Sequence, residues 1–439
     1  MANRDGASQG WASIHAETGV MQDVPAAPGS LGSCRFCQAP LRHVFVDLGM
    51  SPLCESYIGA DRLNHMEPFY PLLTLVCERC LLVQLLEYVS PQAIFSDYAY
   101  FSSYSDSWLR HVEAYTTMAI ARFALGSTSQ VIELASNDGY LLQYFVAAGV
   151  PVLGVDPAAN VAEAARAKGI STHVAFFGQK TALDLVARGH KADLLIGNNV
   201  LAHVPDLNDF VRGMKILLSS SGVITMEFPH LQRLMEGNQF DTIYHEHFSY
   251  FSFTTVERVF AAHGLTVFDV EELKTHGGSL RIYARHAENT AQPIRSSVVA
   301  LRERESAGGF TTLRHYLSFA KQVEDTKHKL LEFLIQIKRS GKSIAGYGAP
   351  GKGNTLLNYC GIRTDFLDYT VDRSLHKQGM YLPGTHIPIH APERISETRP
   401  DYLLILPWNL KDEIMRQMAY IREWGGQFVA PIPEVLVYP

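Results

Sequence analysis

The feature that most constrains the fold is a regular alternation of short apolar runs with amphipathic segments, which occurs twice along the chain. In the first alternation, strands are expected at 130–134, 151–157, 192–200 and 223–229, and helices at 139–149, 158–169 and 207–222. In the second, which follows a long helical segment at 317–340, strands are expected at 342–348, 366–373, 401–408 and 427–438. Strands and helices that alternate at this spacing form doubly wound parallel sheets. The predicted fold class is therefore α/β, with a Rossmann-like domain followed by a second, smaller α/β domain.

The length and charge of the chain agree with several domains and narrow the range of partners. A chain of 439 residues is too long for one compact core, and a net charge of −6 argues against a nucleic-acid-binding surface spread over the whole molecule. No apolar run reaches the roughly 20 residues of a membrane span, and the first 32 residues lack the apolar core of a signal peptide. We therefore expect a cytoplasmic protein with no nucleic-acid or membrane partner, present as a monomer or a weak dimer. The predicted parts are a disordered tail at 1–32, a cysteine module at 33–87, a first α/β domain at 88–316 and a second at 317–439.

Four of the six cysteines are grouped in two C-x-x-C pairs, Cys34 with Cys37 and Cys77 with Cys80. Each pair presents two sulfur atoms from one short turn, and two such turns make a tetrahedral thiolate site for Zn²⁺. Because four thiolates leave no open position for chemistry, the predicted zinc is structural. Cys54 and Cys360 are unpaired in this scheme and are expected to be small core residues.

The first predicted strand of the first alternation ends in the turn ELASNDG, where Gly139 lets a ligand approach the backbone. Ligands of open parallel sheets bind beyond the carboxyl ends of the strands, so this turn is the expected binding position. Glu133 and Asp138 would repel a phosphate, and no Lys or Arg is expected near them, so a cationic ligand is favoured. S-adenosylmethionine, with a sulfonium and an ammonium group and no phosphate, meets this requirement. Asp156, at the end of the next strand, is placed to accept hydrogen bonds from ribose hydroxyls.

The second alternation carries a glycine-rich turn of the opposite character, GYGAPGKGN. Its G-x-G-x-x-G spacing ends at Gly351, and Asp372 follows about 20 residues later, which is the pattern of a dinucleotide-binding turn. The turn also approaches a P-loop, but Gly353 stands where the metal-binding Ser or Thr would be, so nucleotide hydrolysis is not expected. Backbone N–H groups, a helix N-terminus and Lys352 predict a pyrophosphate ligand. Whether it belongs to NAD or to a nucleotide-activated substrate stays open.

The segment DTIYHEHFSYFS, residues 241–252, places titratable side chains among aromatic ones. It is a metal site, a proton-transfer site or a polar surface, because an ordinary buried strand would desolvate these groups at a cost. On a strand, His245 and His247 would share a face and could bind a metal. Glu246 would then point the opposite way, so Glu246 and His247 can face one substrate only if the segment is a loop.

The four-cysteine module followed in order by ELASNDGYL, GNNVLAHVPD, YHEHFSYFS, THGGSLR and GYGAPGKGNTLLNYCGI resembles the sugar C-methyltransferases, which act on nucleotide-linked deoxysugars in antibiotic and polysaccharide pathways. The resemblance covers about residues 33–439. It implies a zinc-binding N-terminal domain, a middle domain that binds S-adenosylmethionine and a C-terminal domain that helps to hold the nucleotide sugar.

The resemblance also implies a reaction and a set of site residues. A base removes a proton alpha to the carbonyl of a 4-ketosugar carried on a nucleotide, dTDP in our expectation, and the enolate takes the methyl group. The base is the second histidine of YHEH, His247, and near-neutral imidazole suits that task. The other residues with implied catalytic roles are Tyr244, Glu246, His203 and Asn199. The donor is expected to contact Tyr98, Glu133, Asn137, Asp138, Gly139, Asp156, Pro157 and Asn198. The substrate is expected to contact His276, Gly277, Arg281, Tyr347, Gly351 and Lys352.

Two other functions remain open from the sequence. An NAD-dependent oxidoreductase would use the glycine-rich turn at 346–351, and a scaffold protein without activity would use the zinc module and both α/β domains to bind partners. The role of His245 is unassigned.

Overall fold

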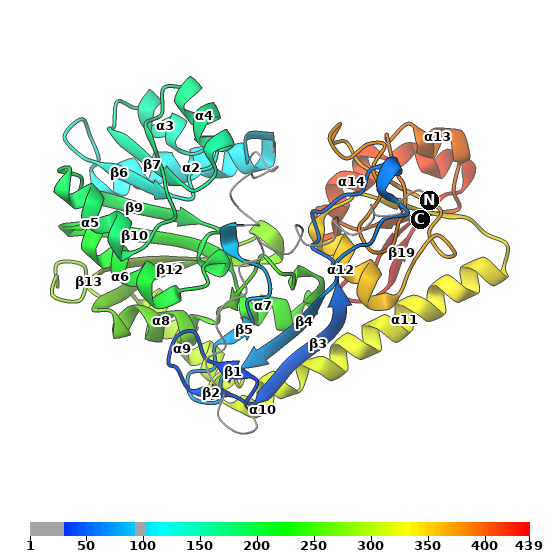
Figure 1. The fold of residues 1–439 in the computed structure, drawn as a ribbon, viewed down its shortest axis with the longest axis horizontal. Coiled ribbons are helices and arrows are strands. Elements are labelled where there is room, and N and C mark those ends of the chain that lie inside the picture. The colour runs from blue at the N-terminus through cyan, green and yellow to red at the C-terminus, as the bar shows by residue number, and fades with distance from the viewer. Residues whose placement is uncertain (1–29, 93–101, 105) are drawn as a thin grey trace, which may run out of the picture.

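The computed structural model describes residues 30–92, 102–104 and 106–439, and these form two lobes joined by a smaller module (Figure 1). The lobe on the left of the view holds the first alternation of strands and helices, and the lobe on the right holds the second. The cysteine module lies below and between them, and the long helix α11 (Phe319–Arg339) runs from this module to the right lobe. Within the described part of the chain, no helix combines the length and apolar character needed to cross a membrane.

The left lobe is built on a seven-stranded mixed sheet with the order β12-β13-β10-β9-β6-β7-β8. Five strands are parallel, namely β6 (Val131–Leu134), β7 (Val152–Asp156), β8 (Thr172–Val174), β9 (Ala192–Asn198) and β10 (Leu218–Pro229). The hairpin of β12 (Leu265–Leu273) and β13 (Ser279–His286) adds two antiparallel strands at one edge. The expectation of a Rossmann-like domain is confirmed, with the correction that its sheet is mixed: a short hairpin connection makes adjacent strands antiparallel.

Helices cover both faces of this sheet. They are α2 (Asp106–Phe123), α3 (Leu142–Ala147), α4 (Ala159–Ala167), α5 (Gln179–Ala187), α6 (Leu207–Leu217), α7 (Leu231–Glu236), α8 (Phe253–Ala262) and α9 (Ser296–Ala307). Helix α6 ends five residues before the predicted boundary, because the serine-rich stretch after Leu217 is already extended at the start of β10. The β8–α5 unit is absent from the sequence prediction, since β8 has only three residues and little apolar character.

The cysteine module, called the zinc module from here on, is an antiparallel sheet of β3 (His43–Ser51), β4 (Tyr70–Val76) and β5 (Val83–Leu85), preceded by the small β1–β2 hairpin (Gly32–Ser33 and Pro40–Leu41). Its fourth strand comes from the left lobe: β11 (Ser249–Tyr250) pairs with β5. The module is therefore joined through its sheet to the segment that follows His247.

The right lobe is a six-stranded sheet with the order β16-β15-β14-β17-β18-β19. Its strands are β14 (Ile344–Tyr347), β15 (Thr370–Val371), β16 (Ile389–His390), β17 (Tyr402–Ile405), β18 (Gln427–Ala430) and β19 (Leu436–Tyr438), of which only β19 is antiparallel. Helix α12 (Gly351–Cys360) follows the glycine-rich turn, and α13 (Arg394–Thr398) and α14 (Lys411–Gln417) complete the lobe. The single strand expected at 427–438 is a hairpin, because Pro431 and Pro433 interrupt it. The second, smaller α/β domain is confirmed.

The hydrophobic core connects all three parts. One cluster of buried side chains joins the zinc-module residues Leu41, Leu75 and Leu82 to the middle of the left sheet. A second joins the other face of the module to α11 and the right lobe. The module thus packs against both lobes, and this packing fixes the position of any group that its loops carry.

Candidate active site

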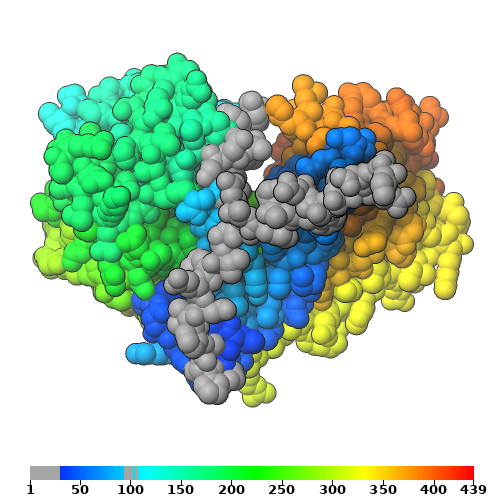
Figure 2. Space-filling view, in the orientation of Figure 1, coloured from blue at the N-terminus to red at the C-terminus, as the bar shows by residue number. Residues whose placement is uncertain are grey.

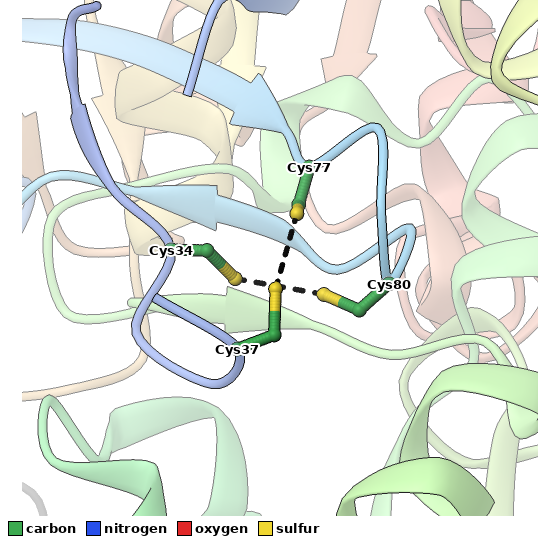
Figure 3. Close-up of side chains that lie close together, drawn as sticks. All are labelled: Cys34, Cys37, Cys77 and Cys80. Carbon is green, nitrogen blue, oxygen red and sulfur yellow. Dashed lines mark hydrogen bonds between the residues drawn. The ribbon is translucent and has the colours of Figure 1, made fainter. Parts of the chain in front are cut away.

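The four cysteines of the two C-x-x-C pairs meet in one cluster at the edge of the zinc module (Figure 3). Cys34 and Cys37 come from the β1–β2 turn, and Cys77 and Cys80 from the β4–β5 turn. The Sγ atoms of Cys34 and Cys80 are 3.5 Å apart, as are those of Cys37 and Cys77, and all four sulfurs lie within 4.8 Å of one another. Zn–S bonds of about 2.3 Å in a tetrahedron place sulfurs about 3.8 Å apart. The cluster therefore fits Zn²⁺ without rearrangement, and all four coordination positions belong to the protein.

The turn that follows β6 is strongly bent, as a close-approach loop requires. Ala135, Asn137 and Gly139 have φ angles of 56°, 49° and 76°, in the left-handed region. A Cβ atom at Gly139 would lie 2.3 Å from Cδ1 of Ile170, so no larger residue fits there without movement. The predicted role of Gly139 in shaping this turn is consistent with both observations.

Three carboxylates gather beneath this turn. Glu133 is fully buried, and burial together with the charges of Asp156 and Asp138 raises its pKa well above the usual range, although the Tyr140 hydroxyl opposes this. Asp156 accepts hydrogen bonds from the backbone N–H of Ala158 and of Asn137, each at 2.9 Å, which holds it at the carboxyl end of β7. Clustered carboxylates in a buried site favour a cationic ligand. The donor set therefore fits the positive charges of S-adenosylmethionine.

One premise of the sequence argument is wrong. We expected no Lys or Arg near the acidic turn, but Lys168, at the end of α4, donates from Nζ to the Asp138 carboxylate at 3.0 Å and to the Asp138 carbonyl at 2.9 Å. The lysine is 30 residues away in sequence and reaches Asp138 because α4 packs beside β7 and β8. Glu133 and Asp156 have no such lysine contact within the described residues. Pro157 directly follows β7, and Asn198 is the last residue of β9, so both lie at the carboxyl ends of the parallel strands. Tyr98 lies outside the described residues.

The segment that carries the YHEH sequence is a loop, as a joint role of Glu246 and His247 requires. The backbone turns at His245 and Glu246, where His247 N donates to Tyr244 O at 2.9 Å. His247 lies at the centre of an aromatic group: its ring centroid is 4.1 Å from that of Tyr244 and 4.7 Å from that of His203. The loop after β9 and the loop before β11 thus meet at this imidazole.

The protonation of His247 follows from its partner. Nδ1 lies 2.9 Å from the carbonyl oxygen of Thr242, which can only accept, so Nδ1 carries the hydrogen and Nε2 carries a lone pair. Burial lowers the pKa of His247 well below its usual value, and the nearby His203, His276 and Lys352 lower it further. The imidazole is therefore neutral at physiological pH, with a basic nitrogen available.

His245 and Glu246, which precede His247 in the loop, both lie against the zinc module. His245 is buried and turns to the zinc module, with Nε2 at 3.2 Å from Pro71 O. The imidazoles of His245 and His247 therefore diverge, and the only group of three or more potential metal ligands among the described residues is the four-cysteine cluster. Glu246 lies against the zinc module as well, with Oε1 4.0 Å from Cys54 Sγ.

A second set of polar side chains comes from the loops after β9 and β12. Asn199, with a left-handed φ of 53°, donates from Nδ2 to Nε2 of His276 at 3.0 Å. His203 ends the turn after β9, and burial lowers its pKa to about 4, although a hydrogen bond to the Glu246 backbone opposes this. Desolvation by surrounding residues, with the charge of Lys352, likewise lowers the pKa of His276 to about 4, although this residue keeps an exposed surface. The three side chains are neutral donors and acceptors around His247.

Arg281 faces the interior of the sheet. Its guanidinium lies 2.6 Å from Oε2 of the fully buried Glu227, 3.2 Å from Glu271 and 4.4 Å from the ring of Tyr115. His111 binds the same Glu227 carboxylate at 2.9 Å. The predicted contact of Arg281 with substrate therefore competes with internal partners of both terminal nitrogens, while Nε is buried without a hydrogen-bond partner among the described residues.

The glycine-rich turn of the right lobe is packed against other parts of this protein. Gly348 has φ 88° and a Cβ there would lie 2.5 Å from Pro407; at Gly351 a Cβ would lie 2.8 Å from Sγ of Cys54. The Asp372 carboxylate accepts hydrogen bonds from Ala349 N at 2.7 Å and Ser374 N at 2.8 Å. Both the spacing of the glycines and the acidic residue are thus explained by internal contacts.

Lys352, on the first turn of α12, is the cation of this turn that reaches the His247 region. Its Nζ lies 2.8 Å from Oδ1 of Asn409 and 4.7 Å from the ring of Trp408. Trp408 donates its indole N–H to Asp241 at 2.7 Å, and burial raises the pKa of this carboxyl to about 6. Lys352 therefore stands at the boundary between the lobes. Tyr347 instead packs in the apolar core of the right lobe.

The boundary between the lobes is hollow. Figure 2 shows the two lobes separated at the top of the view, above the blue residues of the zinc module. Gly277 lies on this boundary, because a Cβ there would meet Trp408 of the right lobe at 2.9 Å.

Sequence reasoning missed Asp241 as a site residue and the His111–Glu227 pair. Asp241 opens the titratable segment, but nothing in the sequence pairs it with a tryptophan 167 residues away.

Comparisons with known proteins match three successive parts of the chain, and the last matched part begins ahead of β13, inside the left lobe. Three family models match: "Putative zinc binding domain" at residues 34–95, "Methyltransferase domain" at 108–270 and "C-methyltransferase C-terminal domain" at 274–433. The chain is 36% identical over 414 residues to C-methyltransferase NovU of Streptomyces niveus, a match that covers 94% of this chain and 98% of NovU.

Solved structures were also compared with this chain. Magnesium protoporphyrin IX methyltransferase from Synechocystis, with bound SAH, is 16% identical with a TM-score of 0.32 and covers 40% of this chain and 82% of its own. An S-adenosylmethionine-dependent methyltransferase from Clostridium acetobutylicum is 12% identical with a TM-score of 0.33, over 40% of this chain and 92% of its own.

Proposed function

The chain belongs to the S-adenosylmethionine-dependent C-methyltransferases, and from this membership we propose that it methylates a carbon alpha to the carbonyl of a nucleotide-linked 4-keto-deoxysugar, with dTDP as the nucleotide. S-adenosylmethionine is its methyl donor, and the four cysteines bind a structural zinc ion. The pathway in this proposal is deoxysugar formation for a natural product or a polysaccharide. The observation that carries the proposal is the tautomer of His247.

His247 acts as the base in the proposed reaction. Its Nδ1–H is held by the Thr242 carbonyl, so Nε2 accepts the proton when the C–H bond alpha to the carbonyl breaks. The electron pair of that bond forms an enolate, which then makes the new C–C bond to the methyl group. When bound, S-adenosylmethionine supplies that methyl as an electrophile, and the C–S electrons leave with the sulfur. The ring of Tyr244, 4.1 Å from that of His247, limits access of water to the base.

The negative charge that develops on the enolate oxygen needs donors close to the base. His203 is next to His247, and its low pKa keeps it neutral, so one of its ring nitrogens carries a hydrogen that it can donate to the oxygen. Asn199 is held by His276, from the neighbouring loop. One such donor stabilises a developing oxyanion by about 3–4 kcal/mol. These residues therefore supply the polar half of the proposed sugar site.

The nucleotide end of the substrate is assigned to the right lobe. Lys352 is a half-buried cation at the N-terminus of α12, which is a favourable position for phosphate oxygens. Its charge acts on His247 and His276, so an anion bound to Lys352 lies close to the sugar site. An NAD-dependent reaction has less support, because Cys54 and Pro407 fill the space beside the glycines and Asp372 is bonded to backbone N–H groups.

The test is incubation of the protein with labelled S-adenosylmethionine and a panel of nucleotide 4-ketosugars, with the new methyl group located by mass spectrometry and NMR. Exchange of the α-proton in deuterated water reports the His247 step alone. His247→Gln is expected to lower kcat and the exchange rate by about 10²–10⁴-fold, with S-adenosylmethionine affinity unchanged by calorimetry. His245→Gln is the matched control, because His245 faces Pro71. Near-normal turnover of His247→Gln would exclude the assigned base.

A further inference from the structure

The strand that follows His247 is part of the zinc module rather than of the lobe that carries it. β5 begins three residues after Cys80, and β11 begins two residues after His247. The two strands pair in the register Ser249 opposite Gln84 and Tyr250 opposite Val83, and Leu85 N donates to Phe248 O at 3.0 Å. The zinc cluster and the His247 loop are thus neighbours across one short strand pair.

Gln84 connects this strand pair to the cysteine cluster. It is 1% exposed, its Nε2 donates to Sγ of Cys34 at 3.3 Å, and its Oε1 accepts from Arg35 N at 2.9 Å. One amide group therefore meets both a thiolate, which needs a donor, and a backbone N–H, which needs an acceptor. A carboxylate or an ammonium side chain offers only one of these two functions. Gln84 holds the first C-x-x-C turn at a fixed distance from Ser249.

Arg35, inside the first C-x-x-C turn, connects the cluster to both histidine loops. Its Nη1 donates to Pro205 O at 2.9 Å, two residues after His203, and its Nη2 donates to Leu85 O. The guanidinium carbon lies 5.5 Å from the ring of Phe248, the residue after His247. The loops are also tied to each other, because Phe248 N donates to Ala202 O at 2.8 Å.

We propose that Arg35 and Gln84 are positioning residues, which transmit the fixed geometry of the cysteine cluster to the His203 and His247 loops. The proposal rests on the proposed function in which His247 is the base. β11 has only two residues, so its own ladder is too short to fix the loop before it. The planar fork of Arg35 reaches carbonyls on two separate segments, a geometry that lysine cannot reproduce.

The first test needs no substrate. Protein labelled with ¹³C in its histidines is compared by NMR with Arg35→Lys and Gln84→Met, after zinc analysis of each sample. We expect the ring resonances of His203 and His247 to shift in both variants while zinc stays at one ion per chain. His190, whose Nδ1 lies 2.9 Å from Nε2 of Gln130 in the left lobe, is the internal reference and should not move. Thr74→Val is the control variant, because Thr74 is buried in β4 of the same sheet and its hydroxyl donates to Val46 O at 2.9 Å.

The second test is kinetic. Arg35→Lys and Gln84→Met are expected to lower kcat by about 10–100-fold, the range for outer-sphere partners of functional groups. The affinity for S-adenosylmethionine should be unchanged, since the acidic turn after β6 contacts neither residue. Unshifted His203 and His247 resonances, or wild-type kcat in both zinc-loaded variants, would overturn the proposal. Lack of methyl transfer by the wild-type protein to every ketosugar would defeat the proposed function, while the NMR comparison would still decide whether the network fixes the histidine loops.

Discussion

Replacement of Arg281 by methionine separates a structural from a substrate-binding role for this residue. The guanidinium lies 2.6 Å from Oε2 of Glu227, a carboxylate with no exposed surface. Removal of one partner from a buried ion pair leaves an uncompensated charge and costs about 3–5 kcal/mol of stability. His111 and Thr275 still bond to the carboxylate, so we expect a loss near the lower end of this range. Methionine keeps most of the apolar stem, which limits any loss from packing.

The pH dependence of this loss has a distinctive sign. In the wild-type protein burial raises the pKa of Glu227, but the His111 hydrogen bond and the Arg281 charge bring it below the usual value. The ionised group therefore contributes stability at neutral pH that is lost as pH falls through its folded-state pKa. In Arg281→Met burial is opposed by fewer partners, so the folded-state pKa rises and the neutral carboxyl becomes the favoured form. The difference in unfolding free energy between the two proteins should thus be largest at neutral pH and shrink as the solution is acidified.

Urea unfolding followed by fluorescence between pH 5 and neutral pH measures this difference. The range begins at pH 5 because Glu227 is then still ionised in the unfolded chain, where the pKa of Glu is about 4.3. Arg285→Met is the control, because Arg285 lies on the same strand but donates only to backbone carbonyls of Gln292, His286 and Ala287. Its loss should not vary with pH in the same way. If Arg281→Met unfolds like the wild type but binds nucleotide sugar more weakly, the guanidinium acts on the substrate and the reasoning from Glu227 is refuted.

Three further results are expected. The acid limb of kcat/KM should lie below pH 6.5, because burial lowers the pKa of His247 and the base is lost only as pH falls through that lowered value; a limb at or above 6.5 in a pH–rate profile would contradict this. Cys77→Ser should lose zinc in metal analysis and unfold less cooperatively, since the site has four thiolate ligands and no replacement. Gly139→Ala should weaken S-adenosylmethionine binding in calorimetry, because a Cβ would lie 2.3 Å from Ile170 at φ 76°. Gly126→Ala, with nothing within 4 Å of its Cβ, should bind normally.

The strands at the centre of both sheets could be predicted because buried parallel strands are short apolar runs, and the runs at 131–134 and 344–347 are of this kind. The short strands at the sheet edges could not be predicted in this way. β11 has two residues and pairs with a strand about 165 positions earlier, so no local pattern identifies it. Its partner is selected by the packing of the zinc module against the left lobe, which is a tertiary interaction. The same absence of local signal hid the β8 strand.

The site shows the same limit. The segment 241–252 could be singled out from sequence because an unusual density of titratable groups carries a desolvation cost that a merely structural segment avoids. The choice of His247 within it came from the family resemblance. The need for a loop at Glu246 was also predictable, since a strand would separate neighbouring side chains, and the turn at His245 and Glu246 meets it. The partners of two buried carboxylates could not be predicted, because they come from elements distant in sequence. Trp408 bonds to Asp241, and His111 and Arg281 bond to Glu227.

The glycine-rich turn of the right lobe explains why a motif can be present without its usual ligand. G-x-G-x-x-G spacing arises wherever a strand, a sharp turn and a helix must approach other atoms closely, and those atoms need not belong to a pyrophosphate. Here Cys54 of the zinc module occupies the space beside Gly351, and the same Cys54 lies 4.0 Å from Glu246. The turn is therefore shaped to receive a loop of its own chain that also contacts the His247 segment. Only Lys352, which bonds to Asn409 and acts electrostatically on His247, extends from the turn toward the hollow between the lobes. In the proposed function, the phosphates at this turn are therefore held by the Lys352 side chain, whose Nζ lies beside Asn409 and Trp408, and not by the glycines.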